Sequence, residues 1–141
     1  MKLNALCDWY TNLSPQSLEY VRELYHERAR FRDPFNDVQG HEAILGVFRH
    51  MFENTDDPKF RILETQSNEP VAWVAWTFSV GVFGKVVDID GMTRLEFADD
   101  GRVLHHRDYW DASELYEQIP LAGGILGFLR RKMSPGEKHH K

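Results

Sequence analysis

The chain has 141 residues and a net charge of −5, which is enough length for one domain with a sizeable core. The negative charge disfavours nucleic acid as a partner, because the phosphate backbone attracts cationic surfaces. The single cysteine, Cys7, excludes an internal disulfide and suits a reducing compartment. Its side chain is either part of the buried core or a reactive thiol. No apolar run is long enough to span a bilayer and no signal peptide opens the chain, so we expect a cytoplasmic protein.

The first part of the chain has helical periodicity interrupted by one strand. The expected elements are helices over residues 3–13 and 14–25, a strand over 28–33, a loop over 35–40 and a helix over 44–52. Ser14-Pro15 is typical of a helix start, since serine caps the first turn and proline fits its first position.

The second part of the chain reads as consecutive strands. We expect them over residues 60–66, 71–82, 86–97 and 103–111, the last one delivered by the hairpin signal Asp99-Asp100-Gly101. Helices first and antiparallel strands afterwards indicate an α+β domain of order α-α-β-α-β-β-β-β. We expect this domain to be a half-cone, in which a strongly curved antiparallel sheet wraps around the helices and leaves a pocket between the two layers.

A C-terminal helical extension is expected over residues 112–133 of a single domain that spans residues 1–133. Asp111 caps its start, and Pro120 interrupts it before a short second piece. This apolar extension either closes the pocket or covers a partner; contact of residues 115–133 with a membrane surface is a less favoured alternative, because only three basic residues end the stretch. Residues 134–141 read as a flexible tail.

The strand over residues 103–111 is the most informative stretch. Side chains alternate across a strand, so one face carries His106, Asp108 and Trp110. Inward positions given to an imidazole, a carboxylate and an indole indicate a cavity wall rather than a dry core. His106 and Asp108 are candidates for an acid–base pair. The alternatives are a buried polar network, or an outward face on which Asp108 pairs with a nearby arginine.

Asp33 is the leading candidate for a general base. Arginines alternate with Ala29, Phe31 and Asp33 in its strand, and the arginines prefer water, so Asp33 shares the buried face. Burial among apolar groups raises the pKa of a carboxyl toward working pH, as proton abstraction requires. The alternative is that Asp33 only caps the turn at Pro34-Phe35.

Three further aromatic positions complete the candidate site. Tyr10 lies on the inner stripe of the first helix, where its hydroxyl either donates to a carbonyl oxygen that becomes negative or packs in the core. Trp73 and Trp76 point to opposite faces of their strand, so one lines the cavity and the other lies on the outer face. An aromatic outer face favours a homodimer. We expect no metal site, because the rings of His105 and His106 point to opposite faces.

Three short motifs resemble the NTF2-like superfamily, in its ketosteroid-isomerase-like and SnoaL-like (polyketide cyclase) branches. They are Cys7-Asp8-Trp9-Tyr10, then Phe31-Arg32-Asp33-Pro34 with Gly40 opening the next helix, and His106-Arg107-Asp108-Tyr109-Trp110-Asp111. The resemblance covers roughly residues 3–111 and implies an NTF2-like half-cone and a homodimer. It also implies that Asp33 matches the proton-shuttling aspartate of the isomerase, and Tyr10 its oxyanion-hole tyrosine.

One departure from the isomerase argues against steroid isomerase activity. Thr93 holds the position of the isomerase's protonated aspartate, and Asp90 would reach the pocket only through a bulge at Gly91. His106, Asp108 and Trp110 also make this pocket more polar, which resembles the cyclase and hydratase-like branches.

The sequence thus predicts a cofactor-independent isomerase, cyclase or hydratase/dehydratase acting on a small hydrophobic carbonyl compound. Asp33 would be the base, Tyr10 the oxyanion donor, and Asp108 with His106 a second acid–base element. Residues expected to contact the substrate are Phe31, Phe35, Trp76, Thr93 and Trp110. The alternative is a non-catalytic module of the same fold that binds a ligand or another protein.

Overall fold

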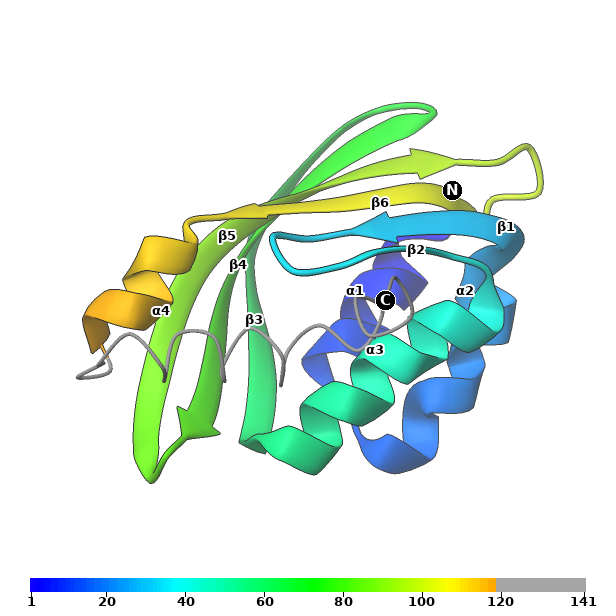
Figure 1. Ribbon diagram of the computed structural model, residues 1–141. Coiled ribbons are helices and arrows are strands. Elements are labelled where there is room, and N and C mark those ends of the chain that lie inside the picture. The colour runs from blue at the N-terminus through cyan, green and yellow to red at the C-terminus, as the bar shows by residue number, and fades with distance from the viewer. Residues whose placement is uncertain (119–141) are drawn as a thin grey trace.

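The computed structural model describes residues 1–118 and consists of short helices and a six-stranded sheet (Figure 1). The helices are α1 (Leu3–Thr11), the 3-10 helix η1 (Pro15–Tyr20), α2 (Val21–Leu24), α3 (His41–Asn54) and α4 (Ala112–Gln118). The strands are β1 (Tyr25–Arg32), β2 (Asp37–Gln39), β3 (Asp56–Asn68), β4 (Val71–Val82), β5 (Lys85–Phe97) and β6 (Val103–Trp110).

The sheet follows the order β2-β1-β6-β5-β4-β3 and curves around α1 and α3 (Figure 1). This arrangement confirms the predicted α+β half-cone. One detail of the prediction is wrong: β1 pairs with β6 in parallel, with Phe31 opposite His106, whereas the other pairs are antiparallel. Strand order along the chain could not reveal this pairing, which joins segments about 75 residues apart.

The predicted loop over residues 35–40 contains a strand, β2. Val38 pairs with Phe31, and the guanidinium of Arg30 donates to both carboxylate oxygens of Asp37 at 2.9 and 2.7 Å. The segment looked like a loop because three paired residues are too few to show alternation. Gly40 then turns the chain into α3 with a φ of 92°, a left-handed conformation that favours glycine.

The second helix is shorter than predicted. It consists of η1 and one turn of α2, and Tyr25 lies in β1 rather than at the helix end. Tyr25 is fully buried and pairs with Val103 of β6, so strand pairing and burial decide its conformation. The predicted start of this segment is confirmed: Pro15 is its first residue, and Ser17 Oγ accepts a hydrogen bond from the Ser14 N–H at 3.0 Å.

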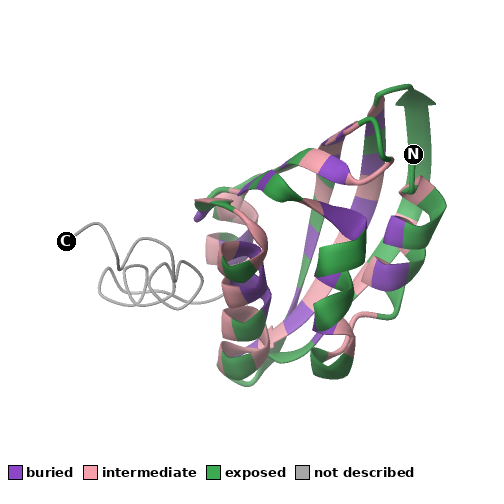
Figure 2. Ribbon diagram, turned by 90° about the vertical axis from the view of Figure 1, so that its right-hand side faces the viewer, coloured by how far each residue is buried: buried purple, intermediate pink, exposed green. Residues whose placement is uncertain are grey.

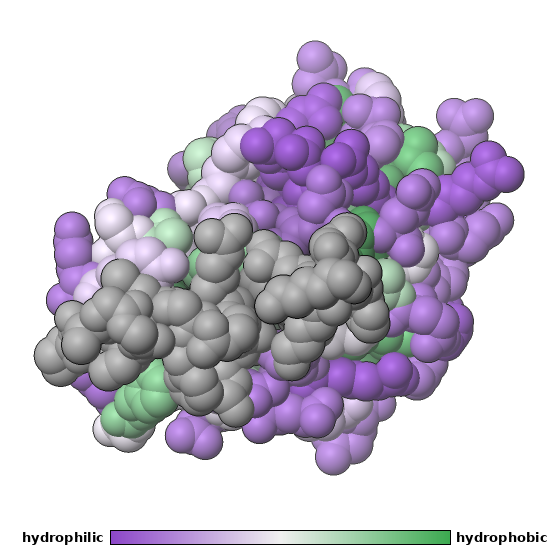
Figure 3. Space-filling model, viewed as in Figure 1, coloured by the Kyte–Doolittle hydropathy of each residue, from purple (hydrophilic) through white to green (hydrophobic). Residues whose placement is uncertain are grey.

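The core lies between the helices and the concave face of the sheet. Buried positions gather on the faces of these layers that point toward one another (Figure 2). Ile44 and Leu45 of α3 and Val103 of β6 are completely buried. The opposite face of β1 carries its arginines, and the surface over β1 and β2 is hydrophilic (Figure 3). The alternation in β1 therefore sorted its two faces correctly.

Strand β5 is regular at Gly91, which pairs with Trp76 on one side and Trp110 on the other. The bulge at Gly91 that would turn Asp90 toward the pocket is therefore absent. Asp90 stays on the outer face, exposed, and accepts a hydrogen bond from Thr77 Oγ1 at 2.8 Å. It does not reach the pocket.

Gly91 instead makes room for the indole of Trp76. A Cβ at residue 91 would lie 2.3 Å from Cη2 of that ring, which is buried and held by a hydrogen bond to Thr93. We expect Gly91→Ala to lower the free energy of unfolding by about 1–3 kcal/mol, the usual cost of overpacking a core. Urea denaturation followed by circular dichroism measures this loss.

Gly46→Ala is the matched control for that substitution. Gly46 lies within α3, and nothing is within 4 Å of the position of its missing Cβ. Alanine favours a helix over glycine by roughly 1 kcal/mol, so this variant is expected to be at least as stable as the wild type. A Gly91→Ala protein of wild-type stability would show that the Trp76 ring moves aside freely.

The C-terminal extension is described only as far as residue 118. The Asp111 carboxylate accepts a hydrogen bond from the Ser113 N–H at 2.9 Å at the start of α4, as the sequence predicts. The second helical piece and the tail lie outside the described residues. Within residues 1–118, no helix is both long and apolar enough to cross a membrane.

Candidate active site

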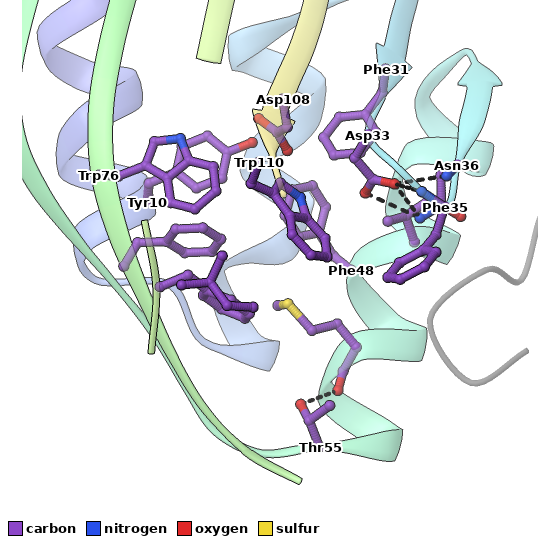
Figure 4. Close-up of a pocket in the computed structure, with 15 residues that line it drawn as sticks. Tyr10, Phe31, Asp33, Phe35, Asn36, Phe48, Thr55, Trp76, Asp108 and Trp110 are labelled. Atoms are coloured by element: carbon purple, nitrogen blue, oxygen red, sulfur yellow. Dashed lines mark hydrogen bonds between the residues drawn. The ribbon is translucent and has the colours of Figure 1, made fainter. Parts of the chain in front are cut away.

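A cavity of about 80 Å³ lies between α1, α3 and the concave face of the sheet (Figure 4). Most of its wall is aromatic or aliphatic, and Asp33, Asn36, Asp108 and Tyr10 bring polar groups to it. Its apolar lining is made by Phe31, Phe35, Val47, Phe48, Met51, Phe60, Trp76, Phe78, Ile89 and Trp110. A concave, mainly apolar site with a few converging polar groups is typical of small-molecule binding.

Most of the residues predicted from the sequence meet in this cavity. Its wall contains seven of them, namely Tyr10, Phe31, Asp33, Phe35, Trp76, Asp108 and Trp110. The other two, Thr93 and His106, line a smaller adjoining cavity of about 20 Å³. Thr93 therefore lies behind the main cavity, where its hydroxyl contacts Trp76 and Asp108 instead of the open space.

The strand face predicted to point inward does so. His106 is buried with 2% of its surface exposed, while Asp108 and Trp110 are partly buried and line the cavity. Of the two candidate tryptophans, Trp76 faces the cavity and Trp73 lies on the outer face. Among residues 1–118, no group of three or more His, Cys, Asp and Glu side chains is arranged to hold a metal ion.

Asp33 caps a turn and lines the cavity at the same time. Its Oδ1 accepts hydrogen bonds from the backbone N–H groups of Phe35 at 2.8 Å and Asn36 at 2.7 Å (Figure 4). The Asn36 side-chain amide donates to both carboxylate oxygens at 3.1 Å. The turn-capping and general-base interpretations of Asp33 are therefore compatible. Oδ1 holds the turn after β1, and Oδ2 accepts fewer hydrogen bonds than Oδ1.

The environment raises the pKa of the Asp33 carboxyl from 3.8 to about 6. Burial is the main cause, because it penalises the charged form, and the nearby Asp108 carboxylate adds to it. The hydrogen bonds from Phe35 and Asn36 oppose the shift without cancelling it. A carboxylate with this pKa is ionised near neutral pH, yet is a stronger base than an ordinary aspartate.

A continuous hydrogen-bond chain crosses the wall beside the cavity. Trp76 Nε1 donates to Thr93 Oγ1 at 2.8 Å, and Thr93 Oγ1 donates to Asp108 Oδ1 at 2.5 Å. The same Asp108 oxygen lies 2.7 Å from His106 Nε2. Asp108 and His106 therefore contact each other, as both an acid–base pair and a buried polar network require, and the outward orientation of Asp108 is excluded.

The chain continues from His106 to two tyrosines. His106 Nδ1 lies 2.8 Å from the hydroxyl of Tyr25, which lies 2.7 Å from the hydroxyl of Tyr10. Burial raises the pKa of both phenols above their usual value, so both remain protonated near neutral pH. Tyr10 thus brings a neutral hydroxyl to the cavity wall.

Sequence reasoning missed Tyr25 and Asn36. Helical periodicity places Tyr25 at the end of the second predicted helix, although a strand that begins three residues earlier than predicted puts it on the same face as Ala29, Phe31 and Asp33. Asn36 had no signal of its own, since an asparagine after Asp-Pro is equally typical of an ordinary turn.

The curved sheet, the helices on its concave side and the enclosed cavity define an NTF2-like α+β protein. Residues 7–106 match the family model of the SnoaL-like domain, and the chain belongs to this family. No curated protein sequence matches it.

Solved structures show the same fold at low sequence identity. A candidate SnoaL-like polyketide cyclase from Jannaschia sp. CCS1 is 17% identical, with a TM-score of 0.72 over 86% of this chain and 90% of that one. A protein of ketosteroid-isomerase-like fold from Catenulispora acidiphila, solved with trimethylamine, is 15% identical, with a TM-score of 0.73 over 85% and 92%. An LEH-like epoxide hydrolase from M. tuberculosis is 16% identical, with a TM-score of 0.67 over 82% and 84%.

Proposed function

We propose that the protein is a cofactor-independent acid–base enzyme that abstracts a proton from carbon next to a carbonyl group in a small hydrophobic molecule. The observation that carries this proposal is the Asp33 carboxyl, held in an apolar cavity with its pKa raised to about 6. Isomerisation, cyclisation and dehydration of carbonyl compounds can each begin with such a step. This first step moves only a proton, which a side chain accepts.

Each polar group has a defined part in this mechanism. Asp33 takes the proton from carbon, and the carbonyl oxygen, which becomes negative, faces the Tyr10 hydroxyl across the cavity. Tyr10 first stabilises that oxygen by a hydrogen bond in an enclosure with little water, and the oxygen then receives a proton to give the enol. The pair of Asp108 and His106 is the second acid–base element, and the surrounding aromatic rings, including Trp110, hold the apolar body of the substrate.

Access to the two carboxyl groups supports the same mechanism. Asp33, Asp108 and Trp110 border both the cavity and a groove on the surface. A substrate that enters from this groove meets the carboxyl groups first. The names of the related candidate polyketide cyclase and epoxide hydrolase are compatible with small-molecule chemistry in a cavity of this fold.

Hydrogen–deuterium exchange at carbon tests the proposal without a known product. A panel of small hydrophobic ketones and enones is incubated with the protein in D₂O, and ¹H NMR follows the signals next to the carbonyl group. Protein-dependent loss of these signals for one class of ketone is the expected result. Quenching of Trp76 and Trp110 fluorescence identifies panel members that bind, so binding without exchange would contradict the enzymatic proposal.

The second candidate function is a non-catalytic ligand-binding module of the same family. The observation that favours it is the turn after β1, in which Oδ1 of Asp33 accepts two backbone N–H groups and so has a structural role. In that case substitution of Asp33 would change stability or ligand affinity, and the protein would catalyse no exchange that the substitution could reduce. The exchange experiment separates the two functions.

We also propose that the protein is a homodimer formed through the outer face of the sheet. Trp73 and Tyr109 are 38% and 44% exposed, and their ring centroids lie 6.1 Å apart. Met92, which pairs with Tyr109 and is 43% exposed, extends this apolar patch, and the Arg107 guanidinium lies over the Tyr109 ring at 4.8 Å. Exposed aromatic patches of this kind favour protein–protein contact.

Trp73→Glu tests the dimer. Two glutamates brought together across the interface would repel each other, so we expect the wild type to sediment as a dimer and the variant as a monomer. Val86→Glu is the control: Val86 is 70% exposed at the far end of β5, so this variant should keep the dimer. Sedimentation velocity measures both, and a monomeric wild type would refute the proposal.

A further inference from the structure

We propose that Tyr25 is a positioning residue through which a doubly protonated His106 directs the Tyr10 proton toward a bound oxygen and replaces that proton once it is transferred. The inference rests on the proposed function, since it names the source of the proton that the substrate oxygen receives. It follows from the order of donors and acceptors along the hydrogen-bond chain from Trp76 to Tyr10.

One end of this chain has a fixed direction. An indole nitrogen only donates, so Trp76 Nε1 gives its hydrogen to Thr93 Oγ1 at 2.8 Å. The Thr93 hydroxyl then points its own hydrogen at Asp108 Oδ1, 2.5 Å away. Asp108 Oδ1 is therefore an acceptor, and His106 Nε2, 2.7 Å from the same oxygen, carries a hydrogen and donates to it.

With a neutral His106, the rest of the chain runs away from the cavity. The single ring hydrogen is on Nε2, so Nδ1 is an acceptor and takes the hydrogen of the Tyr25 hydroxyl at 2.8 Å. The Tyr25 oxygen in turn accepts the hydrogen of Tyr10 at 2.7 Å. The Tyr10 hydroxyl has a single hydrogen, and in this state that hydrogen is directed at Tyr25 instead of at a ligand in the cavity.

With a doubly protonated His106, the same contacts run in the opposite direction. Nδ1 now donates to the Tyr25 oxygen, and Tyr25 donates to the Tyr10 oxygen over unchanged distances. The Tyr10 hydrogen is released from the chain and can point into the cavity. Tyr10 therefore acts as an oxyanion donor, with every contact of the chain intact, only when His106 carries its second proton.

The surroundings of His106 fit a cationic ring. The Asp108 carboxylate compensates its charge, and the Phe31 ring stacks on it with centroids 4.4 Å apart, a favourable contact for a cation. Within residues 1–118, the other titratable groups that contact the ring or line the small cavity beside it are Tyr10 and Cys7 of α1 and Tyr25 of β1. Burial raises the pKa of each of the three, so all are neutral near pH 7, and Asp108 is the acidic group in direct contact with the ring.

The proton transfers balance. As Asp33 takes the proton from carbon, the C–H electron pair forms the new C=C bond and the C=O π pair moves onto oxygen. That oxygen takes the Tyr10 hydrogen, Tyr10 takes the hydrogen of Tyr25, and Tyr25 takes the hydrogen of His106 Nδ1. The result is an enol, a protonated Asp33 and a neutral His106. Reversal of the same steps, with the carbon proton delivered elsewhere on the molecule, restores the starting state.

The test uses 4-nitrophenolate as an oxyanion probe and needs no turnover. The protein is labelled with ¹⁵N-histidine, and the His106 ring signals, assigned by their loss in His106→Gln, are followed against pH with and without the probe. In the wild type we expect the probe to move the His106 titration midpoint upward by about one pH unit, equivalent to about tenfold tighter binding to the doubly protonated form.

Tyr25→Phe separates the relay from a simple attraction between charges. The probe's negative charge acts through space in this variant as well, whereas the hydrogen-bond chain is broken, so we expect most of the shift to disappear. Tyr10→Phe breaks the chain at its other end and should give the same result even if Tyr25→Phe does not fold. An equal shift in both variants, or no shift in the wild type, would overturn the relay. Loss of exchange in Asp33→Asn, by contrast, reports on the proposed function alone.

Discussion

Asp33→Asn is expected to lower the rate of carbon-bound proton exchange by about 10²–10⁴-fold, the usual contribution of a general base. Asparagine has nearly the same shape and its side-chain oxygen can still accept the N–H groups of Phe35 and Asn36, so the turn after β1 is retained. Its amide cannot take up a proton near neutral pH. The ¹H NMR exchange assay in D₂O measures the loss with the best ketone of the panel.

The control is Asp90→Asn, which changes the same charge on the outer face of β5. Asp90 is exposed and contacts Thr77, and the asparagine can still accept that hydrogen bond. Wild-type exchange is therefore expected. Circular dichroism and tryptophan quenching establish that both variants fold and bind the ketone. If Asp33→Asn exchanges at the wild-type rate, Asp33 is not the base and the binding-module function is favoured.

The second large effect concerns stability, because burial of Asp33 opposes folding whenever its carboxyl is charged. The pKa is 3.8 in the unfolded chain and about 6 in the fold, so ionisation favours the unfolded state between these values. Below pH 3.8 the carboxyl is neutral in both states and causes no loss. As pH rises through about 6, the loss reaches roughly 3 kcal/mol of unfolding free energy, since each pKa unit corresponds to about 1.4 kcal/mol.

Comparison with Asp33→Asn isolates this term. Other groups titrate over the same range, but they do so in both proteins, so the difference in unfolding free energy between wild type and variant reports Asp33. We expect the variant to gain roughly 3 kcal/mol on the wild type between pH 3.5 and pH 7.5. Urea denaturation at several pH values measures it. A difference that stays constant with pH would mean that the carboxyl is not destabilised by the fold.

The two predictions share one physical origin. The apolar surround that raises the pKa of the Asp33 carboxyl also lowers the stability of the folded state once that carboxyl is charged. The hydrogen bonds from Asn36 and the backbone reduce that loss of stability and hold the carboxyl in place.

Local pattern was enough to predict which side chains point inward. Alternation along β1 and β6 placed Asp33, His106, Asp108 and Trp110 on buried faces, because a strand can turn a side chain to only two sides. The pattern also fixed the α+β order of elements and the opposite orientations of Trp73 and Trp76. These features depend on residues only a few positions apart, so the sequence by itself determined them.

Pairing between distant strands was beyond that pattern. The parallel contact of β1 with β6 places Phe31 beside His106, and the short strand β2 forms by pairing with the end of β1, with Val38 opposite Phe31. Tyr25 joins the site because its hydroxyl meets both Tyr10 and His106. Such contacts depend on how the sheet curves around α1 and α3, which single-strand periodicity does not contain.

The strength of Asp33 as a base was likewise decided by tertiary structure. A carboxyl on an apolar strand face can have its charge penalised by burial or rescued by hydrogen bonds, and the sequence allowed both outcomes. In the fold, burial and the nearby Asp108 outweigh the hydrogen bonds from Phe35 and Asn36. The sequence thus determined that an aspartate faces inward at the end of β1, and only the packing of the chain around it decided how strongly it holds a proton.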